Sequence, residues 1–163
     1  MPPPVLFIVF NRPETTAQVF AAIRTARPER LYIAADGPRA GREGEAERVA
    51  ETRAIATAVD WPCQVETLVR PENLGCKRAV SSAISWFFEN EPEGIVLEDD
   101  TVPLASFFTY ADEMLERYRH DDRVMMVNGS NLVSHVYKSP YSYFFSAYPR
   151  VWGWVSTASC STN

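Results

Sequence analysis

The chain has 163 residues, of which 46% are hydrophobic and 23% are charged, and its formal net charge is -5. This length fits a single globular domain with a substantial core. The acidic balance excludes nucleic acid as the main expected partner, because binding to a phosphate backbone favours a basic protein face.

The ends of the chain and its cysteines indicate a compartment. Met1-Pro-Pro-Pro4 carries no basic segment, and no apolar stretch approaches the length that spans a bilayer. The three cysteines, Cys63, Cys76 and Cys160, form no Cys-x-x-Cys pair, which favours neither a zinc site nor a disulfide framework. We therefore expect a cytoplasmic protein without a secretory signal.

Strands and helices are predicted to alternate along the chain. Short apolar runs predict strands at residues 5–10, 31–35, 64–69, 95–97 and 123–127, with 64–69 near a sheet edge. Apolar residues at helical spacing predict helices from Pro13, within 41–57, and over 76–88 and 105–118. This alternation predicts an α/β fold with a mostly parallel sheet and helices on both faces.

An acidic run follows the fourth predicted strand. Residues 95–97 are apolar, Glu98, Asp99 and Asp100 come directly after them, and Pro103 ends any regular structure. Three adjacent carboxylates repel one another unless a cation or hydrogen-bond donors offset their charge. Because Mg²⁺ and Mn²⁺ commonly lie between carboxylates and a substrate phosphate, the run predicts a divalent-cation site, with Asp100 as its main ligand. The alternative is an ordinary solvated acidic loop.

Polar groups also follow the other predicted strands. The first strand leads into Asn11 and Arg12, the second stops at Asp36, and the connector after the third carries Arg70 and Lys77. Ligands of open parallel sheets bind outside the carboxyl ends of the strands, and the free N–H groups of a helix start favour anions. These residues and the acidic run are therefore expected to form one ligand site.

Each segment also has a simpler explanation. The run 11–13 could be only a helix start, the run 36–38 only a turn, and the basic residues of the connector only solvated charges. His120 and His135 are expected away from the site, as structural or surface groups.

Several motifs in this order resemble a known family. Phe10-Asn11-Arg12-Pro13, Asp36-Gly37, Arg70-x-x-Asn73-x-Gly75 and Glu98-Asp-Asp-Thr-Val-Pro-Leu-Ala-Ser-Phe-Phe108 are the residues that carry the likeness. Together they resemble the nucleotide-sugar half of a GT-A glycosyltransferase. The chain is most similar in these motifs to the family-2-like bacterial enzymes and to the N-acetylglucosaminyltransferase that begins complex N-glycans. The likeness extends from Val5 to about Ser156.

The resemblance implies a Rossmann-like GT-A fold and a metal-dependent glycosyltransferase, with Mn²⁺ or Mg²⁺ as cofactor. The donor would be a nucleoside-diphosphate sugar, with a UDP-type nucleotide favoured, and the acceptor a glycan, lipid or protein. Inversion at the sugar is the favoured outcome. Enzymes of this type often work at the inner membrane face, which implies peripheral membrane association.

The resemblance also assigns roles to residues. Those implied to bind the donor are Phe10, Asn11, Arg12, Asp36, Arg70, Lys77, Glu98 and Asp99. Asp36 would accept a hydrogen bond from the base, and Glu98 and Asp99 would face the ribose and sugar. Asp100 would hold the cation, whose other positions would go to the diphosphate and water.

The catalytic base of such an enzyme is not identified. Residues 1–138 are expected to form the donor-binding region, and residues 139–163 an incomplete, aromatic-rich start of the acceptor side. Trp152 and Trp154 could stack on sugars or pack in the core. No Asp or Glu occurs after Asp122, so we expect a truncated protein whose exposed aromatic residues promote homodimers or aggregation.

Three other functions are less favoured. A sugar nucleotidyltransferase would need a glycine-rich loop after the first strand, and residues 11–16 hold no glycine. A receiver-type domain would need an aspartate where Arg70 follows the third strand. The serious alternative is a non-catalytic nucleotide-sugar binding module or an inactive remnant.

Overall fold

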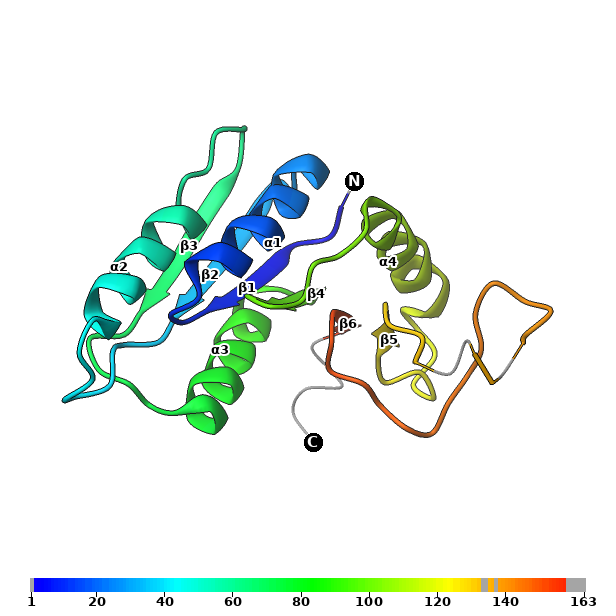
Figure 1. Ribbon diagram of the computed structural model, residues 1–163. Coiled ribbons are helices and arrows are strands. Elements are labelled where there is room, and N and C mark those ends of the chain that lie inside the picture. The colour runs from blue at the N-terminus through cyan, green and yellow to red at the C-terminus, as the bar shows by residue number, and fades with distance from the viewer. Residues whose placement is uncertain (1, 133–134, 137, 158–163) are drawn as a thin grey trace.

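A computed structural model describes residues 2–132, 135–136 and 138–157. Within these residues, six strands form one sheet in the order β3-β2-β1-β4-β6-β5 (Figure 1). The strands are β1 (Val5–Val9), β2 (Arg30–Ala35), β3 (Gln64–Val69), β4 (Glu93–Glu98), β5 (Val127–Asn128) and β6 (Trp154–Thr157). Strands β1 to β4 are parallel to one another, whereas β6 runs antiparallel to both β4 and β5. The α/β class is confirmed, with a mixed sheet.

Helices cover both faces of the sheet, as predicted (Figure 1). The described helices are α1 (Pro13–Ala26), α2 (Glu45–Ala56), α3 (Cys76–Asn90) and α4 (Ala105–Tyr118). Helices α1, α2 and α4 contribute to one core cluster and α3 to the other. None of the described helices is both long and apolar enough to cross a membrane.

The two cores follow from the alternation of side chains along each strand. Phe7 and Leu97 point to the side of α1 and α4, while Leu6 and Val96 point to the side of α3. Successive strand residues face opposite sides of a sheet, so strands buried on both faces are apolar throughout. All four side chains are 3% exposed or less, which fixes the backbone from which the strand ends project.

The predicted strand at 123–127 is wrong. Residues 121–124 form a turn instead, in which the Val124 amide donates to the Asp121 carbonyl over 2.9 Å and the Arg123 side chain pairs with the Asp121 carboxylate. Strand pairing begins only at Val127, which lies opposite Val155 of β6. The apolar run there resembled a buried strand, but Met125 is 62% exposed.

Other predicted bounds shift less. Strand β3 lies at the sheet edge, as predicted, and β4 extends one residue beyond Leu97 to include Glu98. The predicted helix within 41–57 begins at Glu45, after Gly44 in a left-handed conformation. Strand β6 was not predicted as such, and Cys160 lies outside the described residues.

Candidate functional site

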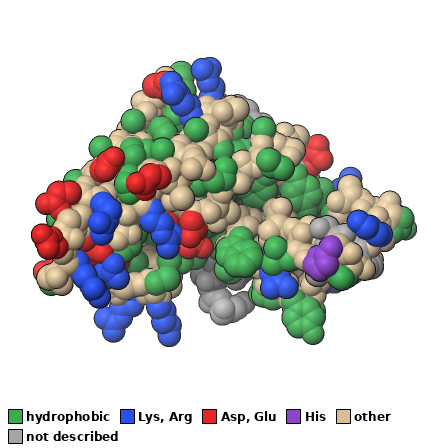
Figure 2. All heavy atoms as spheres, in the orientation of Figure 1, with side chains coloured by type: hydrophobic (Ala, Val, Ile, Leu, Met, Phe, Trp, Pro, Cys, Tyr) green, Lys and Arg blue, Asp and Glu red, His purple; other side chains and the backbone are tan. Residues whose placement is uncertain are grey.

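The candidate site lies where β1, β2, β3 and β4 end. These strands are parallel and in register, with Ile8 of β1 opposite both Ala34 of β2 and Glu98 of β4. Their carboxyl ends therefore meet at one edge of the sheet, where ligands of open α/β sheets bind. On the face shown in Figure 2, Lys and Arg side chains gather at the lower left, where α2 and α3 begin.

Asp99 is the fixed carboxylate of the acidic run. Its side chain is 7% exposed, and it accepts hydrogen bonds from the Phe10 amide and from Arg12 Nη1, each over 3.0 Å. A buried carboxylate without such partners would be costly. Burial raises the pKa of Asp99, while the Phe10 amide and the Arg12 charge act against that rise. Asp99 thus joins the end of β4 to the end of β1.

Arg12 contacts two adjacent aspartates with a single nitrogen. Arg12 Nη1 lies 3.0 Å from Asp99 Oδ1 and 2.6 Å from Asp100 Oδ2. Unlike Asp99, the Asp100 side chain is 49% exposed. Burial acts to lower the pKa of Arg12, but Asp99 and Asp100 together raise it, so the guanidinium stays charged. Asp100 is therefore the acid of the pair that a ligand can reach.

Glu98 completes the acidic run on the other side of the sheet. It is the last residue of β4 and, by alternation with Val96, faces the side of α3. Burial raises the pKa of Glu98, and the charges of Asp100 and Asp99 raise it further. Its carboxylate accepts no hydrogen bond among the described residues, which leaves it available to hydroxyl donors or a cation.

Asp36 holds the connector after β3. Its two oxygens accept hydrogen bonds from the Gly37 and Leu74 amides, each over 3.0 Å, and from Asn73 Nδ2 over 2.9 Å. The side chain is buried, and these donors use most of the lone pairs of a carboxylate. The structure thus gives Asp36 a positioning role that the sequence did not predict. Its oxygens have little remaining capacity to accept a hydrogen bond from a nucleobase.

A second buried carboxylate, Glu45, supports the end of β1. It is 1% exposed and accepts hydrogen bonds from Asn11 Nδ2 over 3.0 Å and from the Arg39 amide over 2.7 Å, while the Arg39 guanidinium pairs with it. These Arg39 bonds hold the pKa of Glu45 down to about 2. The Arg39 guanidinium also lies 5.5 Å from the centre of the Phe10 ring.

Sequence reasoning missed Glu45 and Arg39. Glu45 sits in a segment of alternating acids and bases that is typical of a solvated helix. The available signal was the start of α2 at Glu45, since an acid in the first helical turn is favoured by the helix dipole. In the structure, the Glu45 carboxylate holds the Asn11 side chain and so shapes the turn after β1.

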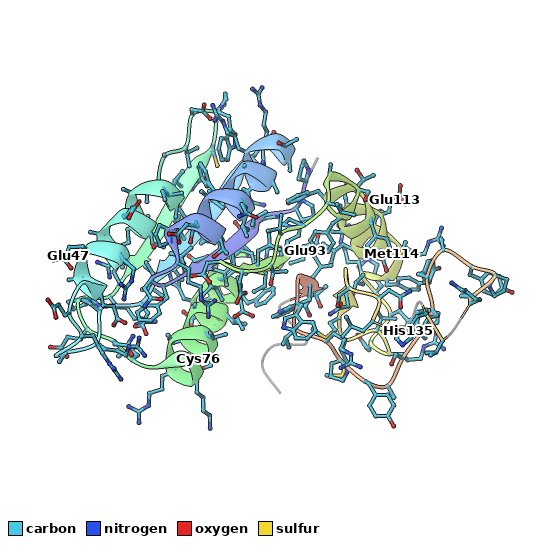
Figure 3. All side chains as sticks on the ribbon, viewed as in Figure 1. Glu47, Cys76, Glu93, Glu113, Met114 and His135 are labelled. Carbon is cyan, nitrogen blue, oxygen red and sulfur yellow. The ribbon has the colours of Figure 1, made fainter. Side chains whose placement is uncertain are left out.

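The basic residues of the connector divide into two kinds. Arg70 donates from Nη2 to Ser82 Oγ over 2.6 Å and is thereby tied to α3, while its carbonyl accepts a hydrogen bond from Arg53. Lys77 and Arg78 are exposed in the first turn of α3, next to Cys76. Figure 3 shows Cys76 at the start of α3, whereas His135 lies apart from it, in the segment after β5.

The C-terminal strand brings further residues to this edge. Because β6 is antiparallel to β4, the residues before Trp154 lie beside the end of β4. A methyl group at Gly153 would lie 3.4 Å from the Thr101 side chain, just past the acidic run. Trp154 packs on Phe88 with ring centres 6.4 Å apart, while Trp152 is 53% exposed. Of the two tryptophans, Trp152 is the more exposed.

The acidic run fits a cation that shares its ligands with a substrate. Two carboxylates of the run contact one guanidinium there, Asp100 is half exposed, and Asp100 Oδ1 and the Glu98 carboxylate accept no hydrogen bond from described residues. No group of three or more His, Cys, Asp and Glu side chains suited to a metal occurs in the described part of the chain. A Mg²⁺ or Mn²⁺ ion there would depend on phosphate oxygens and water for most of its ligands.

The chain matches no protein-family model, and a search of curated proteins finds no similar sequence.

Proposed function

We propose that this edge of the sheet binds a nucleoside-diphosphate sugar together with Mn²⁺ or Mg²⁺, and that the protein is a GT-A-type glycosyltransferase. The observation that carries the proposal is the meeting of Arg12 with the acidic run at the ends of adjacent parallel strands. A cationic side chain beside half-exposed carboxylates suits a diphosphate bound with a divalent cation.

The residues suited to binding the nucleotide sugar divide by charge. Arg12 and the exposed Lys77 are suited to the diphosphate, since guanidinium and ammonium groups bind phosphate oxygens. The half-buried Glu98 is suited to sugar or ribose hydroxyls. Phe10 and Asn11 shape the turn that would lie beside the nucleobase. Asp36 would help to form the nucleobase site indirectly, by holding the connector at 73–74 in place.

The chemistry needed is stabilisation of a leaving diphosphate. A divalent cation held by Asp100 supplies charge neutralisation to such a leaving group when bound. Arg12 would add a second positive charge, because Asp99 keeps its guanidinium at the site. On the acceptor side, the exposed face of Trp152 is suited to stacking on a sugar ring.

The alternative function is binding of the nucleotide sugar without transfer. The observation that favours it is that the described carboxylates at this edge, Glu98, Asp99 and Asp100, already have roles toward the donor or the cation, whereas an inverting transfer also requires a base for the acceptor hydroxyl. None of these carboxylates is therefore assigned to take the proton of the acceptor hydroxyl.

Release of nucleoside diphosphate separates the two functions. The protein is incubated with UDP-, GDP- and dTDP-sugars and Mn²⁺, with and without simple glycan acceptors, and the free nucleoside diphosphate is measured. A transferase releases it, and Asp100→Asn reduces the release at least about 100-fold, whereas Asp122→Asn, an exposed aspartate in the 121–124 turn, does not. Binding of a donor without release would support the binding module.

A further inference from the structure

Arg12 pairs with the carboxylate, Asp100, that the proposed metal ion would bind. Asp100 Oδ2 lies 2.6 Å from Arg12 Nη1, in a short charge-assisted contact. A divalent cation on either oxygen of this carboxylate would place two positive charges within a few bond lengths of each other, which like-charge repulsion opposes. The guanidinium and the cation therefore compete for Asp100.

The two aspartates differ in what they can release. Asp99 is 7% exposed and also bound by the Phe10 amide, so it keeps Arg12 at the site. Asp100 is 49% exposed, and its contact with Arg12 is an exposed ion pair, which contributes little and breaks readily. Arg12 can therefore leave Asp100 while staying attached to Asp99.

The rest of the guanidinium is available to an anion. Both hydrogen bonds of the Arg12 side chain to described residues come from Nη1, so Nε and Nη2 have no partner among those residues. Arginine binds phosphate with paired, parallel N–H donors. A diphosphate offers Arg12 a better partner than the carboxylate that it would give up.

We propose that Arg12 is a latch on the metal site, which pairs with Asp100 when the site is empty and moves to the diphosphate when the donor binds. This inference rests on the proposed function, because it takes Asp100 as the cation ligand. Without a diphosphate the latch weakens cation binding, and with one it frees Asp100. Binding of the two ligands is then positively coupled, and the coupling is reciprocal.

Two binding measurements on one set of variants test the latch. Mn²⁺ binding without nucleotide is followed by the loss of the free-ion paramagnetic resonance signal, and UDP binding without metal by calorimetry. Arg12→Gln is expected to bind Mn²⁺ at least about threefold more tightly and UDP at least about threefold more weakly than the wild type. Opposite changes of the two affinities are what a shared guanidinium requires.

Matched variants separate the latch from general charge effects. Arg24→Gln removes another exposed arginine of α1, which pairs with Asp60, and should change neither affinity. Arg12→Lys keeps a positive charge that can contact both aspartates through one nitrogen, so it should bind Mn²⁺ as the wild type does, but it should bind UDP more weakly because it lacks the planar fork. If Arg12→Gln does not fold, as near-ultraviolet circular dichroism would reveal, Arg12→Met, which also removes the charge, carries the test.

The latch and the proposed function fail in different ways. Mn²⁺ binding that Asp100→Asn abolishes, but that Arg12→Gln leaves unchanged or weakens, overturns the latch and retains the metal site. If neither the wild type nor the Arg12 variants bind Mn²⁺, with or without UDP, both are overturned.

Discussion

Asp99 and Asp100 are neighbours in the chain with opposite surroundings. Asp99 is buried and holds the Phe10 amide and Arg12, while Asp100 is half exposed and contacts Arg12 alone among the described residues. Both residues lie in the turn after β4, and their side chains converge on the same Arg12 nitrogen, but only Asp99 also reaches the Phe10 amide at the end of β1. One aspartate builds the site and the other is offered to a ligand.

This contrast predicts different costs for two adjacent substitutions. Asp99→Ala leaves the Phe10 amide and Arg12 without their acceptor and should lower the free energy of unfolding by about 1–3 kcal/mol. Asp100→Ala should change it by less than about 1 kcal/mol, because an exposed ion pair contributes little. Urea denaturation followed by circular dichroism measures both. A larger loss for Asp100→Ala than for Asp99→Ala would contradict this assignment.

Glu45 predicts a dependence of stability on acid. Its pKa is about 2 in the folded protein, below the roughly 4.3 of an unfolded glutamate, because Arg39 donates hydrogen bonds to it. A lowered carboxyl pKa stabilises the fold above the unfolded value, and this contribution is lost as pH falls from about 5 to 2. Glu45→Gln should therefore be less stable than the wild type at pH 7, and the difference should shrink over that range. An equal difference at pH 7 and pH 3 would contradict the pairing.

Residue-scale features were predicted from sequence to different degrees. The acidic run was recognisable because three carboxylates directly follow an apolar strand. The Glu45–Arg39 pair was not, since burial of one acid in an amphipathic helix depends on the distant turn at Asn11. The hydrogen bonds that residues 73–74 donate to Asp36 likewise join segments far apart in the sequence.

At the scale of elements, the connector at 71–75 packs tightly on the end of β2. A Cβ added at Gly37 would lie 2.4 Å from the carbonyl carbon of Glu72, so the two backbones touch there. This approach allows Asp36 to reach the Leu74 amide. Only a residue without a side chain fits at position 37.

Gly37→Ala should therefore push the connector away and lower the free energy of unfolding by about 1–3 kcal/mol, because backbone atoms cannot yield cheaply. It should also weaken nucleotide binding if the connector lies at the donor site. Gly41→Ala is the control in the same loop: it meets no atom within 4 Å, so its cost is limited to the strain of a φ of +72°. If wild type and Gly37→Ala bind UDP equally well, the connector is not part of the nucleotide site.

The elements themselves were largely predictable where local pattern decides. The amphipathic helix at 105–118 was predicted at the bounds of α4, and the strands buried on both faces read as continuous apolar runs. The antiparallel β5–β6 pairing was not predictable, because β5 has two residues and gains its order from Val155 and Trp154 across the sheet. Such short strands carry little local signal.

At the scale of the whole molecule, large apolar side chains concentrate on one exposed segment. Between residues 141 and 152, the side chains that are at least half exposed include Tyr141, Phe145, Tyr148, Val151 and Trp152. Exposed apolar surface of this kind promotes association. Homodimer formation through this segment remains a prediction. The exposed side chains named above are the ones that would form the contact.

Self-association should rise with concentration, and the double variant Phe145→Ser/Tyr148→Ser should reduce it. Leu104→Ser, which changes a side chain 77% exposed outside the segment, should leave it unchanged. Sedimentation velocity over about a hundredfold range of concentration measures the effect. A monodisperse monomer throughout that range would contradict the prediction.

The measurement that tests the central claim most directly is calorimetric titration of UDP into the protein with and without Mn²⁺, repeated with Asp100→Asn. The whole arrangement of the sheet edge, with Arg12 fixed by Asp99 and Asp100 half exposed, predicts binding that Mn²⁺ strengthens at least about tenfold and that the substitution returns to the metal-free value. No binding of UDP, GDP or dTDP under either condition would contradict the claim that this edge is a nucleotide-sugar site.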